Sequence, residues 1–146
     1  MTREEFEQLV EQEFPNAIPE KFRPHIKNVA FLVEDEPSPE VRKREGLTQE
    51  ETLLGYYHGI PTPMRGDWYG MGTTMPDTIT LFQKPIEEQA HELEHSNILQ
   101  NVRISYTDLV RKIIRETIWH EVAHHFGFDE NQVQQKEQKR DGKGSL

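Results

Sequence analysis

The stretch HEVAHHFGFDE, at positions 120–130, concentrates histidines and acidic residues in a pattern that suits metal binding. His120 and His124 are four residues apart, so on a helix their imidazoles lie on one face, a turn from each other. Both can then bind a single zinc ion at about 2.0–2.1 Å. Glu121 has the position of a general base that hydrogen-bonds the water on the metal and takes its proton. The spacing therefore indicates a zinc-activated water.

Zinc in such a site also needs a third protein ligand, and Gly127 affects where that ligand can come from. If the helix continued, residue 130 would lie about 9 Å further along the axis than His124 and would face another direction. A glycine just after a helix end can adopt the left-handed conformation that turns the chain back. The third ligand is therefore expected among the acids after this turn: Asp129, Glu130 and Glu137.

Glu130 is the favoured third ligand, and Asp129 is its main competitor. Asp129 has a second role open to it, because Asp129 and Gln132 form a capping box for a helix over 130–138. Glu137 would lie two turns into that helix, where its direction depends on the direction of the helix. Two histidines and one carboxylate leave a fourth position open, which is typical of catalytic rather than structural zinc.

The helix that positions the histidines is expected to begin near Ser105, which can cap it, with Asp108 three residues later. Its apolar residues recur at helical spacing and form one stripe: Leu109, Val110, Ile113, Ile114, Thr117 and Ile118. His120 and His124 continue this stripe, so both imidazoles are expected to face inward. A shared metal would satisfy them, since each unsatisfied buried polar group costs about 1–3 kcal/mol. His125 points about 100° away from His124 and is expected to pack or to support the ligands.

The rest of the chain has the pattern of a small sheet with flanking helices. Thr2 and Glu5 form a capping box for a first helix, which Pro15 is expected to close. The other expected elements are a short turn or helix at 19–26, strands at 28–35, 52–61 and 78–83, a helix at 86–95 opened by Pro85, and loops at 36–51 and 62–77. This order predicts an α+β fold with one domain over 1–138 and a polar tail over 139–146.

Composition limits the partners. The 146 residues are enough for one domain, and 34% of them are hydrophobic. A formal net charge of −9 argues against nucleic acid and against an anionic membrane surface. The chain has no cysteine, so zinc must be held by histidine and carboxylate. No signal-peptide pattern or membrane-spanning apolar run is present, and a cytoplasmic location is expected.

The motif at 120–130 resembles that of the zincin superfamily, with an acid at the third-ligand position of the metzincin spacing. More narrowly, the chain resembles a family of small bacterial zincin-like proteins, the minimal metallopeptidases. The segments that carry this resemblance lie between Asn28 and Val133: NVAFLVEDEP, LLGYYHGIP, RGDWYG, MPDTITLFQKPIE and HEVAHHFGFDE. The resemblance implies a single zincin-like domain with a small sheet beside a long active-site helix. It also implies that His120, His124 and Glu130 bind zinc and that Glu121 is the catalytic base.

The resemblance has consequences for substrate binding too. Zincins commonly bind an extended peptide along a sheet edge, and TITLFQ at 78–83 is either that edge or a core strand. Tyr57, His58, Arg65 and Tyr69 are candidates for an oxyanion donor, and packing is the alternative role of such loop residues. All four methionines precede the motif, so the methionine turn of metzincins is absent. No downstream helix is long enough to bring in the distant glutamate ligand of gluzincins.

Two functions are compatible with these patterns. The first is a zinc metallopeptidase that acts on a peptide or protein substrate, with Glu121 as the base. The second is a non-catalytic module of the same fold, in which zinc joins the long helix to the last helix and the protein acts by binding a partner. Glu121 and the open fourth position favour the enzyme. His91 and His95 repeat the four-residue spacing, but they are expected at the surface, as is His25.

Overall fold

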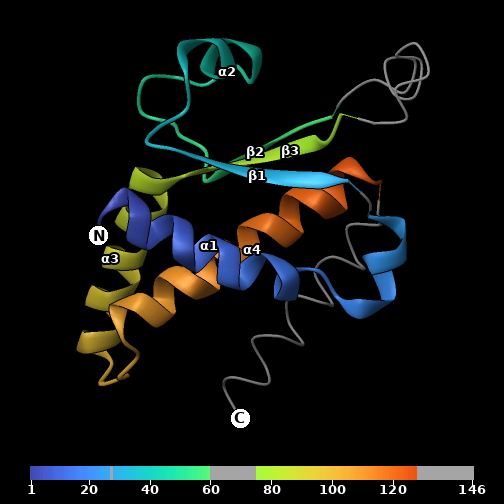
Figure 1. Cartoon of the computed structure of the whole chain (residues 1–146). Coiled ribbons are helices and arrows are strands. Elements are labelled where there is room, and N and C mark those ends of the chain that lie inside the picture. The colour runs from blue at the N-terminus through green and yellow to red at the C-terminus, as the bar shows by residue number, and fades with distance from the viewer. Residues whose placement is uncertain (27, 60–74, 128–146) are drawn as a thin grey trace, which may run out of the picture.

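The computed structural model describes residues 1–26, 28–59 and 75–127, and Figure 1 shows how their elements are arranged. The helices are α1 (Arg3–Ala17), the 3₁₀ helix η1 (Glu20–His25), α2 (Pro39–Arg44), α3 (Gln83–Leu99) and α4 (Tyr106–His125). The strands are β1 (Val29–Glu34), β2 (Gly55–His58) and β3 (Asp77–Phe82). A small sheet lies on one side of α1 and α4, which confirms the predicted α+β class.

The three strands form a mixed sheet in the order β1-β3-β2. β1 runs parallel to β3, and β2 runs antiparallel to it. β3 therefore has a hydrogen-bonded neighbour on each side, and β2 is an edge strand within the described part of the chain. The suggestion that TITLFQ forms the edge was wrong, and the alternative of a core strand is confirmed.

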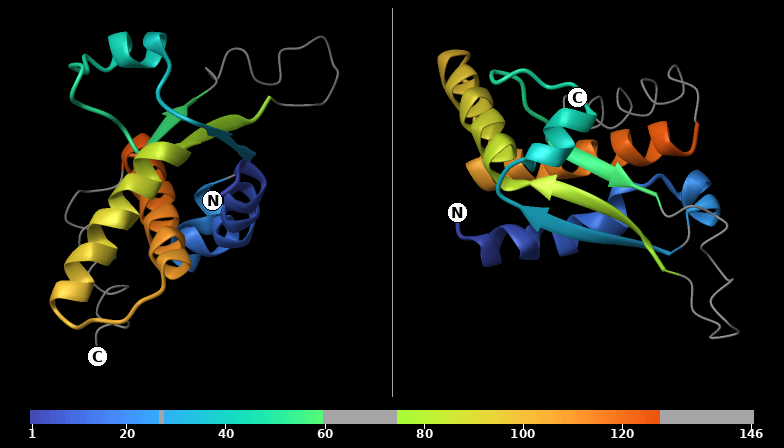
Figure 2. Two further views of the ribbon diagram at one scale, coloured as in Figure 1. Left: turned by 90° about the vertical axis from the view of Figure 1, so that its left-hand side faces the viewer. Right: turned by 90° about the horizontal axis from the view of Figure 1, so that it is seen from above.

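The core lies between the sheet and the helices. Ile79 and Leu81 of β3 are fully buried, and so are Ile114, Ile118 and Trp119 of α4. Each such side chain contributes about 1.5–3 kcal/mol relative to leaving it exposed. Figure 2 shows α1 and α4 side by side beneath the sheet. This packing holds α4 against both α1 and the sheet.

A buried carboxylate joins α1 to α4. Glu13 is only 8% exposed, yet it lies on α1 among apolar residues. Arg111 and Arg115 of α4 donate to its two oxygens, at 3.3 and 3.2 Å. The two guanidinium groups compensate for the cost of burying this charge.

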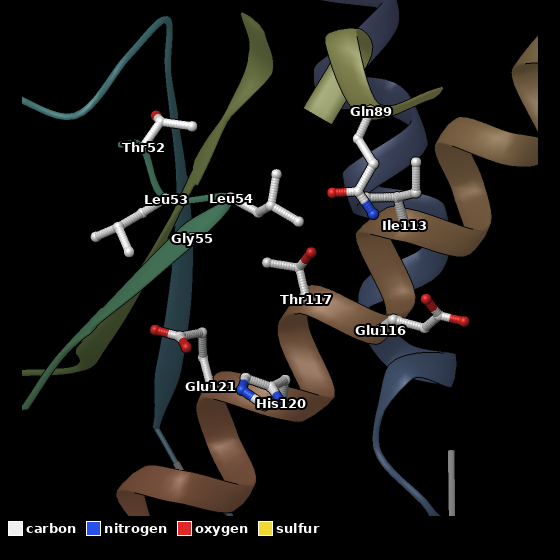
Figure 3. Close-up of a pocket in the computed structure, with 10 residues that line it drawn as sticks. All are labelled: Thr52, Leu53, Leu54, Gly55, Gln89, Ile113, Glu116, Thr117, His120 and Glu121. Atoms are coloured by element: carbon white, nitrogen blue, oxygen red, sulfur yellow. The ribbon is translucent and has the colours of Figure 1, made fainter. Parts of the chain in front are cut away.

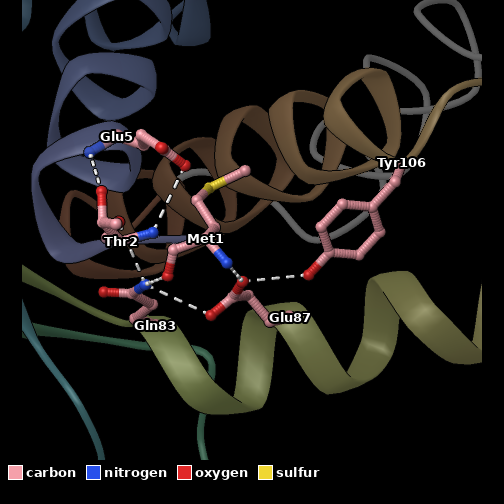
Figure 4. A network of polar contacts seen from close by, with 6 residues as sticks. All are labelled: Met1, Thr2, Glu5, Gln83, Glu87 and Tyr106. Carbon is pink, nitrogen blue, oxygen red and sulfur yellow. Dashed lines mark hydrogen bonds and ion pairs between the residues drawn. The ribbon is translucent and has the colours of Figure 1, made fainter.

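A second polar cluster closes the other end of the helical layer (Figure 4). The Gln83 side-chain amide donates to the Met1 carbonyl at 3.0 Å and to Glu87 at 3.2 Å. The Tyr106 hydroxyl donates to Glu87 at 3.1 Å. Burial, and then this hydrogen bond to a carboxylate, raise the pKa of Tyr106. The start of α4 is thus tied to α3, far along the helix from His120.

Two expectations about the first half of the chain were wrong. α1 passes through Pro15 and ends at Ala17. Proline removes one backbone donor near the helix end, and burial of Ala17 in the core offsets that loss. The stretch at 36–51 is not only a loop, because it contains α2, where the Ser38 hydroxyl accepts from the Val41 N–H at 3.2 Å.

The later helices were predicted more closely. α3 begins at Gln83, before Pro85, and extends to Leu99, so the expected range of 86–95 was too short. The capping box of Thr2 and Glu5 on α1 is confirmed, and Ser105 caps α4 by accepting from the Asp108 N–H at 3.1 Å. No helix in the described ranges is long and apolar enough to cross a membrane.

Candidate metal centre

His120 and His124 lie next to each other on the last turns of α4. Their ring centroids are 4.3 Å apart, with the rings at 62° to each other. The expected pairing of two imidazoles on one helix face is confirmed. Within residues 1–26, 28–59 and 75–127 no three histidine or acidic side chains are grouped so that they could hold a metal. The proposed third ligand Glu130, its competitor Asp129 and the helix at 130–138 lie outside the described residues.

The expectation that both histidines face inward was wrong. His120 and His124 are exposed, and the inward positions at this end of α4 belong to Trp119, Val122 and Ala123. The reason is that the neighbours of α4 change along its length. α3 accompanies the first half of α4 and diverges from it before the last turns (Figure 1). The face that continues the apolar stripe is therefore open where the histidines stand.

The turn after α4 has the conformation that its glycine predicts. Gly127 has φ +70°, in the left-handed region, and its N–H donates to the His124 carbonyl at 3.2 Å. Phe126 caps the helix by donating to the Val122 carbonyl. The helix thus ends immediately after the second histidine, as expected.

Glu121 is half-buried between α4 and β2, and in Figure 3 its carboxylate points toward the strand. Burial raises the pKa of Glu121 above its ordinary value. The neighbouring His120 and a hydrogen bond from the Tyr57 backbone N–H act in the opposite direction and lower the pKa. A carboxylate whose pKa is raised by burial is a better proton acceptor than an exposed one and can later return the proton.

Two hollows meet at Glu121. The first, of about 380 Å³, lies between α4, the start of β2 and α3, and its lining includes Leu54, Ile113, Thr117 and His120 (Figure 3). The second, of about 330 Å³, is lined in part by Glu45, Tyr56, His124 and His125. Leu53, Gly55 and Glu121 line both. His120 thus lines the first hollow, His124 lines the second, and Glu121 is accessible from both.

Glycines allow β2 to approach α4 this closely. A Cβ on Gly55 would lie 2.7 Å from Cγ2 of Thr117, which is too short for real contacts. A Cβ on Gly59 would lie 2.6 Å from Cε1 of His125. These close approaches bring the Tyr57 N–H to Glu121, so the two small residues shape the site without taking part in its chemistry.

Asp77 is a polar residue of this region that sequence reasoning missed. It is 3% exposed and lies on the inner face of β3, two residues before Ile79. The Tyr57 hydroxyl donates to it at 2.5 Å, and Nε2 of His125 lies 3.8 Å from the same oxygen. A signal was present, because the alternation D-T-I-T-L places this acid on the same face as two core residues.

Other predicted residues lie elsewhere. The hydroxyl of Tyr57 is engaged by Asp77, so it is poorly placed as an oxyanion donor. His58 is exposed at the end of β2, and Arg65 and Tyr69 lie outside the described residues. The expectation that His25, His91 and His95 lie at the surface is confirmed. His91 stacks on Tyr106 at 4.5 Å between ring centroids.

Comparison with known proteins identifies the family of the chain. Curated proteins gave no match to the chain. The family model described as zincin-like metallopeptidase matches residues 26–140, which is most of the sequence. The match contains the sheet, the paired histidines and Glu121. The chain therefore belongs to the family of zincin-like metallopeptidases.

Proposed function

We propose that the protein is a zinc-dependent peptidase in which His120, His124 and Glu130 hold the metal and Glu121 is the general base. The observation that carries this proposal is the surroundings of Glu121. Its half-buried carboxylate has a raised pKa, follows one of two adjacent exposed imidazoles, and stands where two hollows meet. A purely structural site has no need of an acid in that position.

The donor set fits zinc. Two imidazoles with ring centroids 4.3 Å apart are borderline ligands of the kind that zinc prefers, a carboxylate would complete the set, and the chain has no thiol. Bound zinc supplies Lewis acidity, which polarises a carbonyl and makes water acidic near neutral pH. Glu130 is proposed as the third ligand because it follows the Gly127 turn at the spacing of the family motif.

Residues of the chain itself transfer the proton and orient both the base and the substrate. Glu121 takes a proton from the attacking water and returns it to the leaving amine, and a pKa above the ordinary value favours the first of these transfers. The Tyr57 N–H holds one orientation of that carboxylate. The first hollow, beside Leu54 and Ile113, accepts a substrate side chain, and β2, an edge strand within the described part of the chain, lies where it can pair with the extended substrate backbone.

The alternative, a non-catalytic zinc-stabilised binding module, has less support. In that reading the metal is needed to hold the end of α4 in place. Trp119, Val122 and Ala123 are fully buried, so packing already anchors that end of the helix. The exposed histidines contribute little to this packing. A role in stability alone would not explain why they lie beside Glu121.

The test combines metal content with hydrolysis. Zinc would be measured by elemental mass spectrometry in the tag-free protein and in Glu130→Ala, Asp129→Ala and Glu121→Gln. We expect near-stoichiometric zinc in all but the Glu130 variant. Cleavage of a mixed peptide library, read by mass spectrometry, should fall by about 10²–10⁴-fold in Glu121→Gln. Unchanged cleavage in that variant would contradict the mechanism, and a wild type without zinc would contradict the metal site.

A further inference from the structure

We propose that Asp77 is a positioning residue of the candidate metal centre. Its buried carboxylate holds Tyr57 and His125 together and thereby fixes both the carboxylate of Glu121 and the helix turn that carries His124. This inference rests on the proposed function, because it assigns Asp77 a role in the site where zinc would bind. No part of it requires Asp77 to touch the metal or a substrate.

The placement of Asp77 calls for an explanation. Its neighbours on the inner face of β3, Ile79 and Leu81, are fully buried and pack in the core. A carboxylate at 3% exposure in such surroundings is costly unless it is hydrogen-bonded and near a positive charge. An apolar residue would continue the alternation at lower cost. The acid is therefore better explained by what it holds than by the stability of the sheet.

The first arm of the arrangement runs through Tyr57. Its hydroxyl donates to Oδ2 of Asp77 at 2.5 Å, while its backbone N–H donates to the carboxylate of Glu121. One residue of β2 thus connects the buried acid to the general base. Fixing the ring of Tyr57 restricts the backbone of this edge strand, which has a ladder partner only on the β3 side in the described part of the chain.

The second arm runs through His125. Its Nε2 lies 3.8 Å from Oδ2 of Asp77, which is too long for a hydrogen bond but places the imidazole ring beside the carboxylate. Its ring stacks on Tyr57, with centroids 3.9 Å apart and planes at 19°. Gly59 leaves the space that this stack needs. Because His125 directly follows His124 on the last turn of α4, holding one also restrains the other.

Replacing Asp77 with leucine separates positioning from stability. Leucine has similar volume, and replacing buried ionic groups with apolar residues is often neutral or stabilising. We expect Asp77→Leu to keep or raise the melting temperature of the zinc-free protein. Its zinc affinity, measured by competition with a chromophoric chelator, should nevertheless fall about tenfold, as it does when groups that orient metal ligands are lost. A merely structural carboxylate would not give this opposite pair of changes.

Tyr57→Phe provides a second, milder variant in case Asp77→Leu does not fold. It removes one hydroxyl and leaves the ring stack and the backbone N–H in place. We expect faster hydrogen exchange of the residue 57 amide in both variants, as in a Glu121→Ala reference, which removes the acceptor. Once a cleaved peptide is known, both variants should lower kcat more than they raise KM.

Glu13→Gln is the matched control. Glu13 is also a buried carboxylate with two partners, but it holds α1 against the first half of α4. The Glu13→Gln variant should have a lower melting temperature. Its zinc affinity and the hydrogen-exchange rate of its residue 57 amide should be unchanged. Wild-type zinc affinity and amide exchange in both Asp77→Leu and Tyr57→Phe would overturn the proposal. If the wild type takes up no zinc, the proposed function fails, and the amide exchange still decides whether Asp77 positions Tyr57 and Glu121.

Discussion

The two halves of α4 differ in what surrounds them. The first half is enclosed, with Leu109, Val110, Ile113 and Ile114 buried against α1 and α3. The last two turns are buried on one side only, while His120, His124 and His125 are exposed on the other. One helix therefore supplies both the packing that fixes its direction and an open face for chemistry. Enclosure of the first half is what allows exposure of the second.

The two buried carboxylates next to α4 show the same division. Glu13 has two arginine partners, and bidentate or paired guanidinium contacts are the strong way to hold a helix in place. Asp77 has a tyrosine and a histidine, whose aromatic rings also stack on each other. The first arrangement joins two helices, and the second joins a strand to the end of α4 beside the proposed base.

The largest expected effect on the comparison between the two halves of α4 comes from Ile114→Ala in the enclosed half. Removing this fully buried side chain should lower the free energy of unfolding by about 2–5 kcal/mol, because a cavity remains. Chemical denaturation would measure this loss. The matched change in the open half is His124→Ala, which should alter the stability of the zinc-free protein by less than about 0.5 kcal/mol. Similar losses in the two variants would contradict the division of α4.

Gly55→Ala tests the close approach of β2 to α4. The added Cβ would lie 2.7 Å from Cγ2 of Thr117, and such overpacking costs about 1–3 kcal/mol. Thr117→Ser removes that methyl group, so the double variant Gly55→Ala/Thr117→Ser should recover much of the loss. Denaturation of the four proteins in this cycle would give the coupling energy. Strictly additive effects would show that the two residues are not in contact.

The smallest expected effect concerns pH and the raised pKa of Glu121. The unfolded chain releases this proton near the ordinary value of 4.5, whereas the folded protein retains it to higher pH. Between these two pKa values the unfolded state binds fewer protons, so the stability of the zinc-free protein falls as pH rises, and then levels off. Glu121→Gln should lack this decline. Parallel stability curves for the two proteins from pH 4 to 8 would refute the assigned shift.

The sequence was informative where structure depends on neighbours in the chain. The capped start of α4, the pairing of His120 with His124 and the left-handed Gly127 all follow from contacts over four residues or fewer. The zincin-like α+β class could also be predicted, from the motif and the segments around it. These features require no knowledge of which elements pack together.

What could not be predicted depends on partners distant in sequence. The two histidines are exposed because α3 diverges from α4 before the last turns (Figure 1). The hydrophobic pattern of α4 does not show where this divergence occurs. Asp77 is paired with residues 20 and 48 positions away, at Tyr57 and His125. Its place on an apolar face was visible in the alternation of β3, but its partners were not. Glu130 as the third ligand stays a prediction.

The pairing of β1 with β3 has a consequence for how the site forms during folding. It joins Val29 to Asp77 in parallel across a long stretch of chain, and such distant pairings form slowly compared with a helix turn. The histidine pair needs only the local turns of α4. The hydrogen bond from Tyr57 to Glu121 needs β2, which is held by β3. A folding chain would therefore present its paired imidazoles before its base is aligned.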